Sequence, residues 1–450
     1  MKISEISRRS QVEKKGGKTG FPAKKNDEND PCVLGEGEIF ARGEVTHQRH
    51  DPYLDFHEKA FGFFHGKAIY LNQFDHFGRR SKMKAWFRYL VVILMFSAFL
   101  TGVAGESLSQ EITYSGPPIT LRFSNHSAAT HPLYKTNWYP FIELVKKESK
   151  GKLLFTVYAA GNLHGPRDGF KACVNNITDW TMGYPSWQAG SFNLTHVIEM
   201  PFAFANEYVA AKVAEELYPK YFKKEYENLG VYLGDFHTTS PTHILTKKPV
   251  RKLEDLKGMK IRTSGGVTSE ILKRLGGVPV FLPSPEVYTS FQRGVLDGVL
   301  TTKQDQAAWR THEIGKFITL MGAYTIPVPT ILNRKTFDGL PKDLKTMFYN
   351  KLRQFNQIAP AGYNANDQEA METFKKAGVE IITLTPAEFE RGKKLVEPLW
   401  EEFATKNAAL GGKKLVEDLR ALNQKYASWT PEQLMKEVMN NPIHGIVDGM

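Results

Sequence analysis

Strand-like and helix-like segments alternate along residues 119–383, and this order constrains the fold more than any other feature of the sequence. Residues 119–124 alternate apolar and polar side chains, as a half-buried strand does, whereas residues 209–218 have the spacing of a helix. Strands that are separated by helices return through parallel crossovers, so the order predicts α/β sheets. The other predicted strands are residues 153–158, 180–184, 230–234, 260–262, 278–282, 295–301 and 378–383.

Two such α/β sections are followed by a long, largely helical segment at residues 341–376. This order predicts two lobes separated by a cleft, and the ligands of such folds bind at the carboxyl ends of the strands. Ser284 and Thr385 are the predicted N-caps of two further helices, because each is followed by a proline and then by acidic residues. The remaining predicted helices are residues 138–145, 168–176 and 268–275.

Residues 83–104 have the layout of a secretory signal peptide: a charged start, an apolar run, and small residues up to Ala104. A transmembrane anchor is the competing interpretation, but the apolar run is shorter than the about 20 residues that a span needs. A signal peptide normally stands at the N-terminus. We therefore expect the protein to start at Met83, residues 1–82 to be absent from it, and the mature exported chain to comprise residues 105–450.

The composition is that of an ordinary globular protein, with 41% hydrophobic and 24% charged residues. The formal net charge is +11, but the basic residues are spread along the chain, so a nucleic-acid partner is not expected. The same charge suits an anionic small ligand. The two cysteines, Cys32 and Cys173, exclude a disulfide framework and a cysteine-rich zinc site.

Sequence motifs of catalysis are missing. There is no Walker loop, no dinucleotide fingerprint, no zinc-protease motif and no nucleophile elbow in the chain. The histidines at 126, 131, 237 and 243 lack the spacing of a metal site. We therefore predict no catalytic residue, no metal and no cofactor.

Arg262 has the best position for binding an anion. It ends a short apolar strand, just before a glycine-containing turn and the start of a helix. A guanidinium there can pair with a carboxylate through two parallel hydrogen bonds, and the helix start adds its positive end. A surface arginine or a salt bridge between the lobes is the alternative interpretation of the position.

Residues from about 119 to 400 resemble the solute-binding proteins of tripartite ATP-independent periplasmic (TRAP) transporters, the dicarboxylate-binding-protein family. The most characteristic stretch is residues 253–262, LEDLKGMKIR. The other stretches that carry the resemblance are FIELVKKESKG at 141–151, GNLHG at 161–165, VIEMPFAF at 197–204, LGGVPV at 275–280, EVY at 286–288 and QRGVLDG at 292–298.

The resemblance implies an α/β fold like that of periplasmic binding proteins, with two lobes that close over an acidic solute and a long helix that spans both. It places the first lobe at residues 117–239 plus 327–366 and the second at residues 240–326 plus 367–450. It also implies a periplasmic mature protein that is not embedded in the membrane and that delivers its solute to TRAP permease subunits.

In the family, the arginine of the segment at 259–262 pairs with the carboxylate of the solute, a role that falls on Arg262. The resemblance also assigns Asn125, at the end of the first strand, and Tyr184, with Trp187 nearby, to the pocket. Thr301 stands where the family often has an asparagine that contacts the solute. The ligand-binding candidates are therefore Arg262, Asn125, Tyr184, Thr301, Trp187 and Trp309.

The sequence departs from the family pattern in two respects. Thr301 offers a hydroxyl in place of an amide, and residues 240–244 lack the second arginine that many members have. The pocket also gains aromatic candidates in Tyr184, Trp187, Phe281 and Trp309. We therefore expect the solute to be a monocarboxylate with an apolar or ring-bearing body. A periplasmic ligand sensor, or an exported enzyme acting on an organic acid, are the alternative functions.

Overall fold

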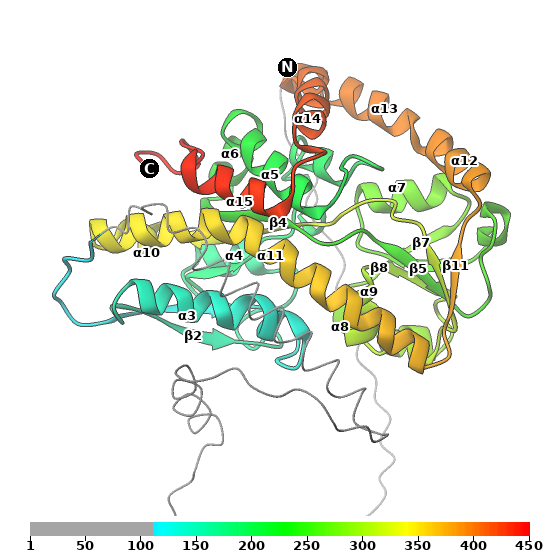
Figure 1. The fold of residues 1–450 in the computed structure, drawn as a ribbon, viewed down its shortest axis with the longest axis horizontal. Helices are drawn as coiled ribbons and strands as arrows, with labels where there is room; N and C mark the ends of the chain where they lie inside the picture. The colour runs from blue at the N-terminus through cyan, green and yellow to red at the C-terminus, as the bar shows by residue number, and fades with distance from the viewer. Residues whose placement is uncertain (1–110, 189) are drawn as a thin grey trace, which may run out of the picture. The chain divides into compact units, whose positions relative to one another are not determined.

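The computed structural model describes residues 111–188 and 190–450, which form two β-sheets with helices packed against them (Figure 1). The predicted upstream segment and the predicted signal peptide lie outside these residues. None of the helices within the described ranges has both the length and the apolar character that crossing a membrane requires.

The first sheet has five strands in the order β2-β1-β3-β10-β4. β1 is parallel to β2 and β3, whereas β10 is antiparallel to both of its neighbours, β3 and β4. The strands are β1 (Ile119–Ser124), β2 (Leu153–Tyr158), β3 (Trp180–Met182), β4 (Val231–Thr238) and β10 (Pro327–Asn333).

The second sheet has six strands in the order β11-β9-β5-β8-β6-β7. β6 is parallel to β7 and β8, and β5 is antiparallel to β8 and β9. The strands are β5 (His243–Thr246), β6 (Lys260–Thr263), β7 (Val278–Phe281), β8 (Gly298–Thr301), β9 (Phe317–Leu320) and β11 (Glu380–Thr383).

Helices follow most of the strands, as the alternation of sequence patterns predicts. The α-helices are α3 (Tyr139–Glu148), α4 (Gly169–Val174), α5 (Glu207–Leu217), α6 (Lys223–Asn228), α7 (Val267–Arg274), α8 (Ser284–Gln292), α9 (Lys303–Ala308), α10 (Arg334–Asp338), α11 (Lys342–Lys376), α12 (Pro386–Val396), α13 (Pro398–Lys406), α14 (Gly412–Tyr426) and α15 (Pro431–Asn440).

The predicted elements are found close to their predicted places, with two kinds of correction. Thr385 caps α12 by accepting a hydrogen bond from the Glu388 amide, but Ser284 is the first residue of α8 rather than its N-cap. The sequence also missed β5, β9 and β10, and both sheets are mixed rather than parallel. β10 was hidden because Pro327 and Pro329 weaken its strand pattern, although all its residues are buried.

The chain passes between the two sheets at three places: from β4 to β5, from β9 to β10, and along α11. The first two crossings coincide with the predicted lobe boundaries at 239/240 and 326/327, and we propose these as the boundaries. The C-terminal helices depart from the predicted division. Although residues 367–450 were assigned to the second lobe, α14 and α15 pack against α5, and α15 also packs against α11.

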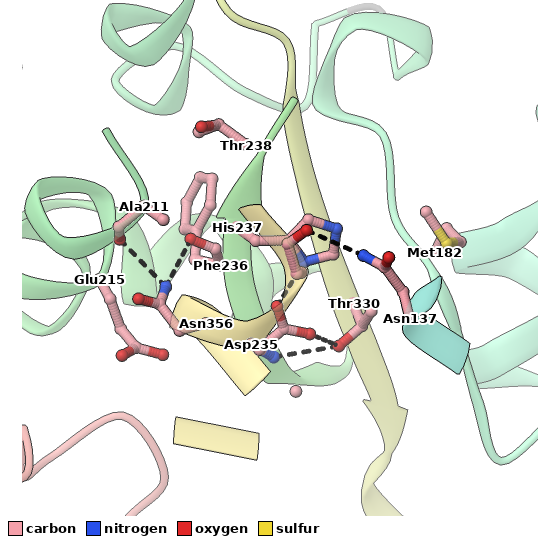
Figure 2. Close-up of polar contacts among 12 residues, drawn as sticks. Asn137, Met182, Ala211, Glu215, Asp235, Phe236, His237, Thr238, Thr330 and Asn356 are labelled. Atoms are coloured by element: carbon pink, nitrogen blue, oxygen red, sulfur yellow. Dashed lines mark hydrogen bonds and ion pairs between the residues drawn. The ribbon is translucent and has the colours of Figure 1, made fainter. Parts of the chain in front are cut away.

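A buried polar cluster attaches α11 to the first sheet (Figure 2). Asn356 of α11 donates hydrogen bonds to the carbonyl oxygens of Ala211 in α5 (3.0 Å) and Phe236 in β4 (2.8 Å). Asp235 and His237 of β4 are both fully buried, and Oδ2 of Asp235 lies 2.5 Å from Nδ1 of His237. Asp235 also accepts a hydrogen bond from the hydroxyl of Thr330 in β10. Because these groups have no access to water, the two bonds of Asn356 hold α11 against this sheet, and the bond from Thr330 to Asp235 ties β10 to β4.

Further along, α11 reaches the second lobe and forms hydrogen bonds with residues of both lobes. Asn366 donates to Thr136, before α3, and to the side-chain oxygen of Gln304 in α9, each at 3.0 Å. The next residue, Asp367, accepts a hydrogen bond from the Gln304 amide (2.8 Å) and lies 3.3 Å from the ammonium of Lys303. Burial raises the pKa of Asp367 to about 6 in spite of that ammonium group.

The raised pKa of Asp367 gives a pH dependence of stability that can be isolated. Between pH 4 and pH 6, folded Asp367 keeps a proton that the unfolded chain releases, so its contribution to the unfolding free energy falls as the pH rises. Asp367→Asn keeps the acceptor for Gln304 and does not titrate. Since one pKa unit corresponds to about 1.4 kcal/mol, we expect the wild type to lose up to about 3 kcal/mol relative to this variant over that range.

Urea unfolding of both proteins from pH 4 to pH 7 measures this difference, and the other carboxyl groups cancel in the comparison. A difference that stays constant with pH, or that changes in favour of the wild type as the pH rises, contradicts the assignment.

Candidate functional site

A cavity of about 60 Å³ is lined by residues that belong to or follow strands of both sheets. His126 follows β1, and Tyr184 follows β3, both in the first sheet. Arg262 is in β6 and Thr301 ends β8, both in the second sheet. The cavity therefore lies at the carboxyl ends of these strands, where the sequence analysis expected the ligand.

Five of the six predicted site residues line this cavity, and they come from different elements. Tyr184 directly precedes the short 3-10 helix η2 (Pro185–Trp187), which begins shortly after β3 with Pro185 as its first residue, and Trp187 is the last residue of this helix. Arg262 and Thr301 lie in strands of the second sheet, and Trp309 follows α9 directly.

Asn125, the sixth predicted residue, is not among the lining residues. Its side chain is buried and organises the loop after β1: the amide oxygen accepts a hydrogen bond from the Ser127 amide (2.9 Å), and the amide nitrogen faces the sulfur of Met182 (3.4 Å). The next residue, His126, lines the cavity instead. The predicted residue is therefore the direct neighbour of the residue that lines the cavity.

Arg262 is a buried cation, with 2% of the residue exposed. Its Nε donates a hydrogen bond to the carbonyl oxygen of Leu282 (2.9 Å), and its guanidinium carbon lies 5.2 Å from the ring centre of Trp309. Within residues 111–188 and 190–450, no carboxylate forms an ion pair with it. Burial lowers its pKa to about 10, so it stays charged at neutral pH.

This arrangement is suited to an anion. A buried charge is costly unless it is paired, so the free Nη groups of Arg262 offer a favourable place for a carboxylate. With Nε committed to Leu282, two parallel hydrogen bonds can form only through Nη1 and Nη2. The alternative of an interlobe salt bridge, left open by the sequence, is not what the described residues form.

Aromatic rings form one wall of the cavity. Tyr184 and Trp187 are stacked with their ring centres 4.3 Å apart, and His126 meets both of them edge-on at 5.3 Å. Burial lowers the pKa of His126 to about 3, so the ring is neutral at physiological pH. Trp187 also donates a hydrogen bond from Nε1 to the carbonyl oxygen of Ser264 (3.2 Å), which joins this wall to the second lobe.

Thr301 belongs to a second polar group in the cavity. Its hydroxyl donates a hydrogen bond to Oδ2 of Asp305 (2.9 Å), and Oδ1 of Asp305 lies 3.4 Å from Nε2 of His131. The sequence analysis did not select Asp305, His131 or His126 for the pocket. The position of Asp305, four residues after Thr301 across a helix start, was a usable signal. The approach of His131 depends on tertiary structure.

The arrangement as a whole is that of a binding site. No group of three or more potential metal-ligating side chains occurs in the described parts of the chain. What lies around the cavity is one buried arginine, an aromatic wall and a hydroxyl–carboxylate–histidine chain. These groups can hold a small anion and orient it.

A model of the bacterial extracellular solute-binding protein family 7, DctP, matches residues 123–407, which is more than half of the sequence. The chain belongs to this family. Family membership confirms the resemblance to TRAP solute-binding proteins that the sequence motifs indicated, and it identifies the protein as a binding protein for a solute.

The matched regions extend over nearly the whole length of the relatives. The C4-dicarboxylate-binding periplasmic protein DctP of Rhodobacter capsulatus is 23% identical over 316 residues, 69% of this chain and 94% of the relative. A TRAP solute-binding protein from Rhodoferax ferrireducens, solved with copurified benzoate, has a TM-score of 0.66 at 22% identity and covers 69% of this chain and 98% of its own.

A TRAP periplasmic solute-binding protein from Bordetella bronchiseptica, solved with bound (R)- and (S)-mandelate, gives a TM-score of 0.64 at 24% identity, covering 68% of this chain and 99% of its own. At these identities the structural likeness shows the fold. It confirms the predicted two-lobe α/β architecture.

The lack of a partner for Arg262 predicts an unusual effect on stability. Arg262→Met replaces a buried, unpaired charge by an apolar side chain of similar length. We expect the ligand-free variant to have an unfolding free energy within about 1 kcal/mol of the wild type or above it, because the lost bond to Leu282 is offset by the relieved burial of charge. Chemical denaturation of the two proteins measures this. A loss of 3 kcal/mol or more would mean that Arg262 has a structural partner.

Proposed function

We propose that this protein captures a small organic acid in the cleft between its lobes, with the carboxylate of the solute paired to Arg262, and delivers it to a TRAP membrane permease. The observation that carries the proposal is the buried Arg262 without an ion-pair partner among the described residues. Asp305, whose carboxylate also lines the cavity, lies beside His131 and forms no ion pair with Arg262, so a bound anion supplies the direct partner that the guanidinium lacks.

The surroundings of Arg262 favour a planar anion. Trp309 lies by the guanidinium and Leu282 takes its Nε, so the side chain is held in one orientation before the solute arrives. Such preorganisation lowers the loss of conformational entropy on binding.

A micromolar affinity corresponds to about −8.2 kcal/mol. One desolvated arginine–carboxylate pair and modest apolar burial are sufficient for it.

The lining of the cavity bears on the solute. The cavity of about 60 Å³ combines the buried Arg262 with the stacked rings of Tyr184 and Trp187. A single cation beside an aromatic wall suits a monocarboxylate with an apolar or ring-bearing body.

Closure of the lobes is proposed as the step that follows capture. Contacts that join the lobes include the bond from Trp187 to Ser264, the approach of His131 to Asp305 (3.4 Å), and the guanidinium of Arg167, which lies 4.5 Å from the ring centre of Phe281. Each involves few atoms and can break and reform as hinged lobes move. The closed form is then the one presented to the permease.

The cellular setting follows from the same proposal. The family description is extracellular, and residues 83–104 fit a signal peptide in sequence. We propose that this segment directs export and that the mature protein acts in the periplasm as a binding protein without catalytic activity.

Arg262→Met tests the proposal through binding. We expect the variant to bind any acid that the wild type binds at least about 30-fold more weakly, because truncating one partner of a buried charge pair costs about 2 kcal/mol or more and 1.4 kcal/mol is tenfold. Isothermal titration calorimetry against a panel of mono- and dicarboxylates gives the affinities.

Arg274→Met is the matched control. Arg274 lies in α7 of the same lobe and pairs at the surface with Glu402 (2.5 Å), away from the cavity lining. The Arg274→Met variant should bind the acids as the wild type does. Equal binding by the Arg262 variant and the wild type would show that the carboxylate site lies elsewhere.

A further inference from the structure

Thr301 has no proton to offer to a solute. Its hydroxyl carries one hydrogen and two lone pairs, and the hydrogen goes to Oδ2 of Asp305 at 2.9 Å. The residue is fully buried and lines the cavity. Only its lone pairs are left for hydrogen bonding there, so Thr301 acts as an acceptor.

Contacts of both its backbone and its side chain hold Asp305 in place. Its backbone amide donates to the hydroxyl of Thr302, which caps α9, at 3.2 Å. Its carboxylate takes the Thr301 proton at Oδ2 and faces Nε2 of His131 at Oδ1, 3.4 Å away. An ionised carboxylate has further lone pairs and no proton, so Asp305 also accepts and does not donate.

The tautomer of His131 follows from its other ring nitrogen. The amide of Leu133 donates to Nδ1 of His131 at 3.3 Å, so in the neutral ring the proton is on Nε2, facing Asp305. The one donor that His131 has is therefore directed to the carboxylate and not to a solute. Because His131 belongs to the first lobe and Asp305 to the second, this contact sets the orientation of Asp305 when the lobes are together.

Arg262 and Thr301 lie on the same face of the second sheet. Arg262 of β6 pairs with Val299 of β8, and Thr301 is two residues further along β8. Since side chains alternate between the faces of a sheet with a period of two, Thr301 is on the face of Val299 and Arg262, diagonally across from the arginine. One small solute can therefore contact both.

We infer that the solute carries a hydrogen-bond donor, a hydroxyl or an ammonium group, in addition to its carboxylate, and that Thr301 and Asp305 recognise this donor. The inference rests on the proposed function, in which Arg262 holds the carboxylate. The Tyr184 hydroxyl, which can donate or accept, does not discriminate between solutes. Thr301 and Asp305 do, because a solute without a donor leaves lone pairs unmatched on the buried hydroxyl of Thr301 and on the half-buried carboxylate of Asp305.

Matched acids test the inference on the purified protein by isothermal titration calorimetry. The sets are propionate, lactate and alanine; butyrate, 3-hydroxybutyrate and 3-aminobutyrate; and phenylacetate, mandelate and phenylglycine. Within a set, one carbon carries hydrogen, hydroxyl or ammonium. In the set that fits the cavity, we expect a donor-bearing member to bind roughly 10- to 100-fold more tightly than the hydrogen member. The better of the two donor members identifies the group.

Variants assign the preference to the two residues. Thr301→Val keeps the shape and removes the acceptor, so the preference should fall to within about twofold, while Thr301→Ser, the control, should retain it. Asp305→Asn supplies a second test if the valine variant fails to fold. It replaces an acceptor-only group by an amide, and the preference should fall at least about tenfold.

The outcomes separate the inference from the proposed function. Equal binding of hydrogen and donor members by the wild type, or a preference that persists in both Thr301→Val and Asp305→Asn, overturns the inference and leaves carboxylate binding intact. Failure of every acid to bind, or undiminished binding by Arg262→Met, overturns the proposed function itself.

Discussion

The site depends on one unbalanced charge. Arg262 is buried in the cavity wall. Its Nε donates a hydrogen bond to Leu282, and its guanidinium lies near the ring of Trp309. No carboxylate of the described residues pairs with it. The protein therefore carries a cost in its ligand-free state that an anion removes. A low-dielectric surrounding makes this pairing stronger than it would be in water. We propose that affinity and the choice of an acid as solute both follow from this residue.

The rest of the fold keeps that charge between two lobes. The chain crosses between the sheets three times, and α11 is bonded on one side to the first sheet through Asn356 and on the other to the second lobe through Asn366 and Asp367. A long helix fixed in this way restricts how the lobes can move, which fits the proposed hinge closure around the cavity. Trp187 is then placed to meet the second lobe at the edge of the site.

Most of the fold, and part of the site, could be predicted from the sequence. Strand and helix periodicity located the elements, and the motif at residues 253–262 located Arg262. β10 was missed because its prolines contradict a strand pattern, and the packing of α14 and α15 on α5 is a long-range contact that the sequence pattern does not show. The polarity of Thr301 could not be predicted, since it depends on which neighbour takes a single proton.

The most direct measurement is a thermal-shift comparison of carboxylic acids with their primary amides, which have nearly the same shape and no charge. The account predicts that an acid that fits the cavity raises the melting temperature, since ligand at 100 times its dissociation constant stabilises by about 2.7 kcal/mol, and that its amide does not. Equal stabilisation by acid and amide would contradict the central claim, because the charge of Arg262 would then have no part in binding.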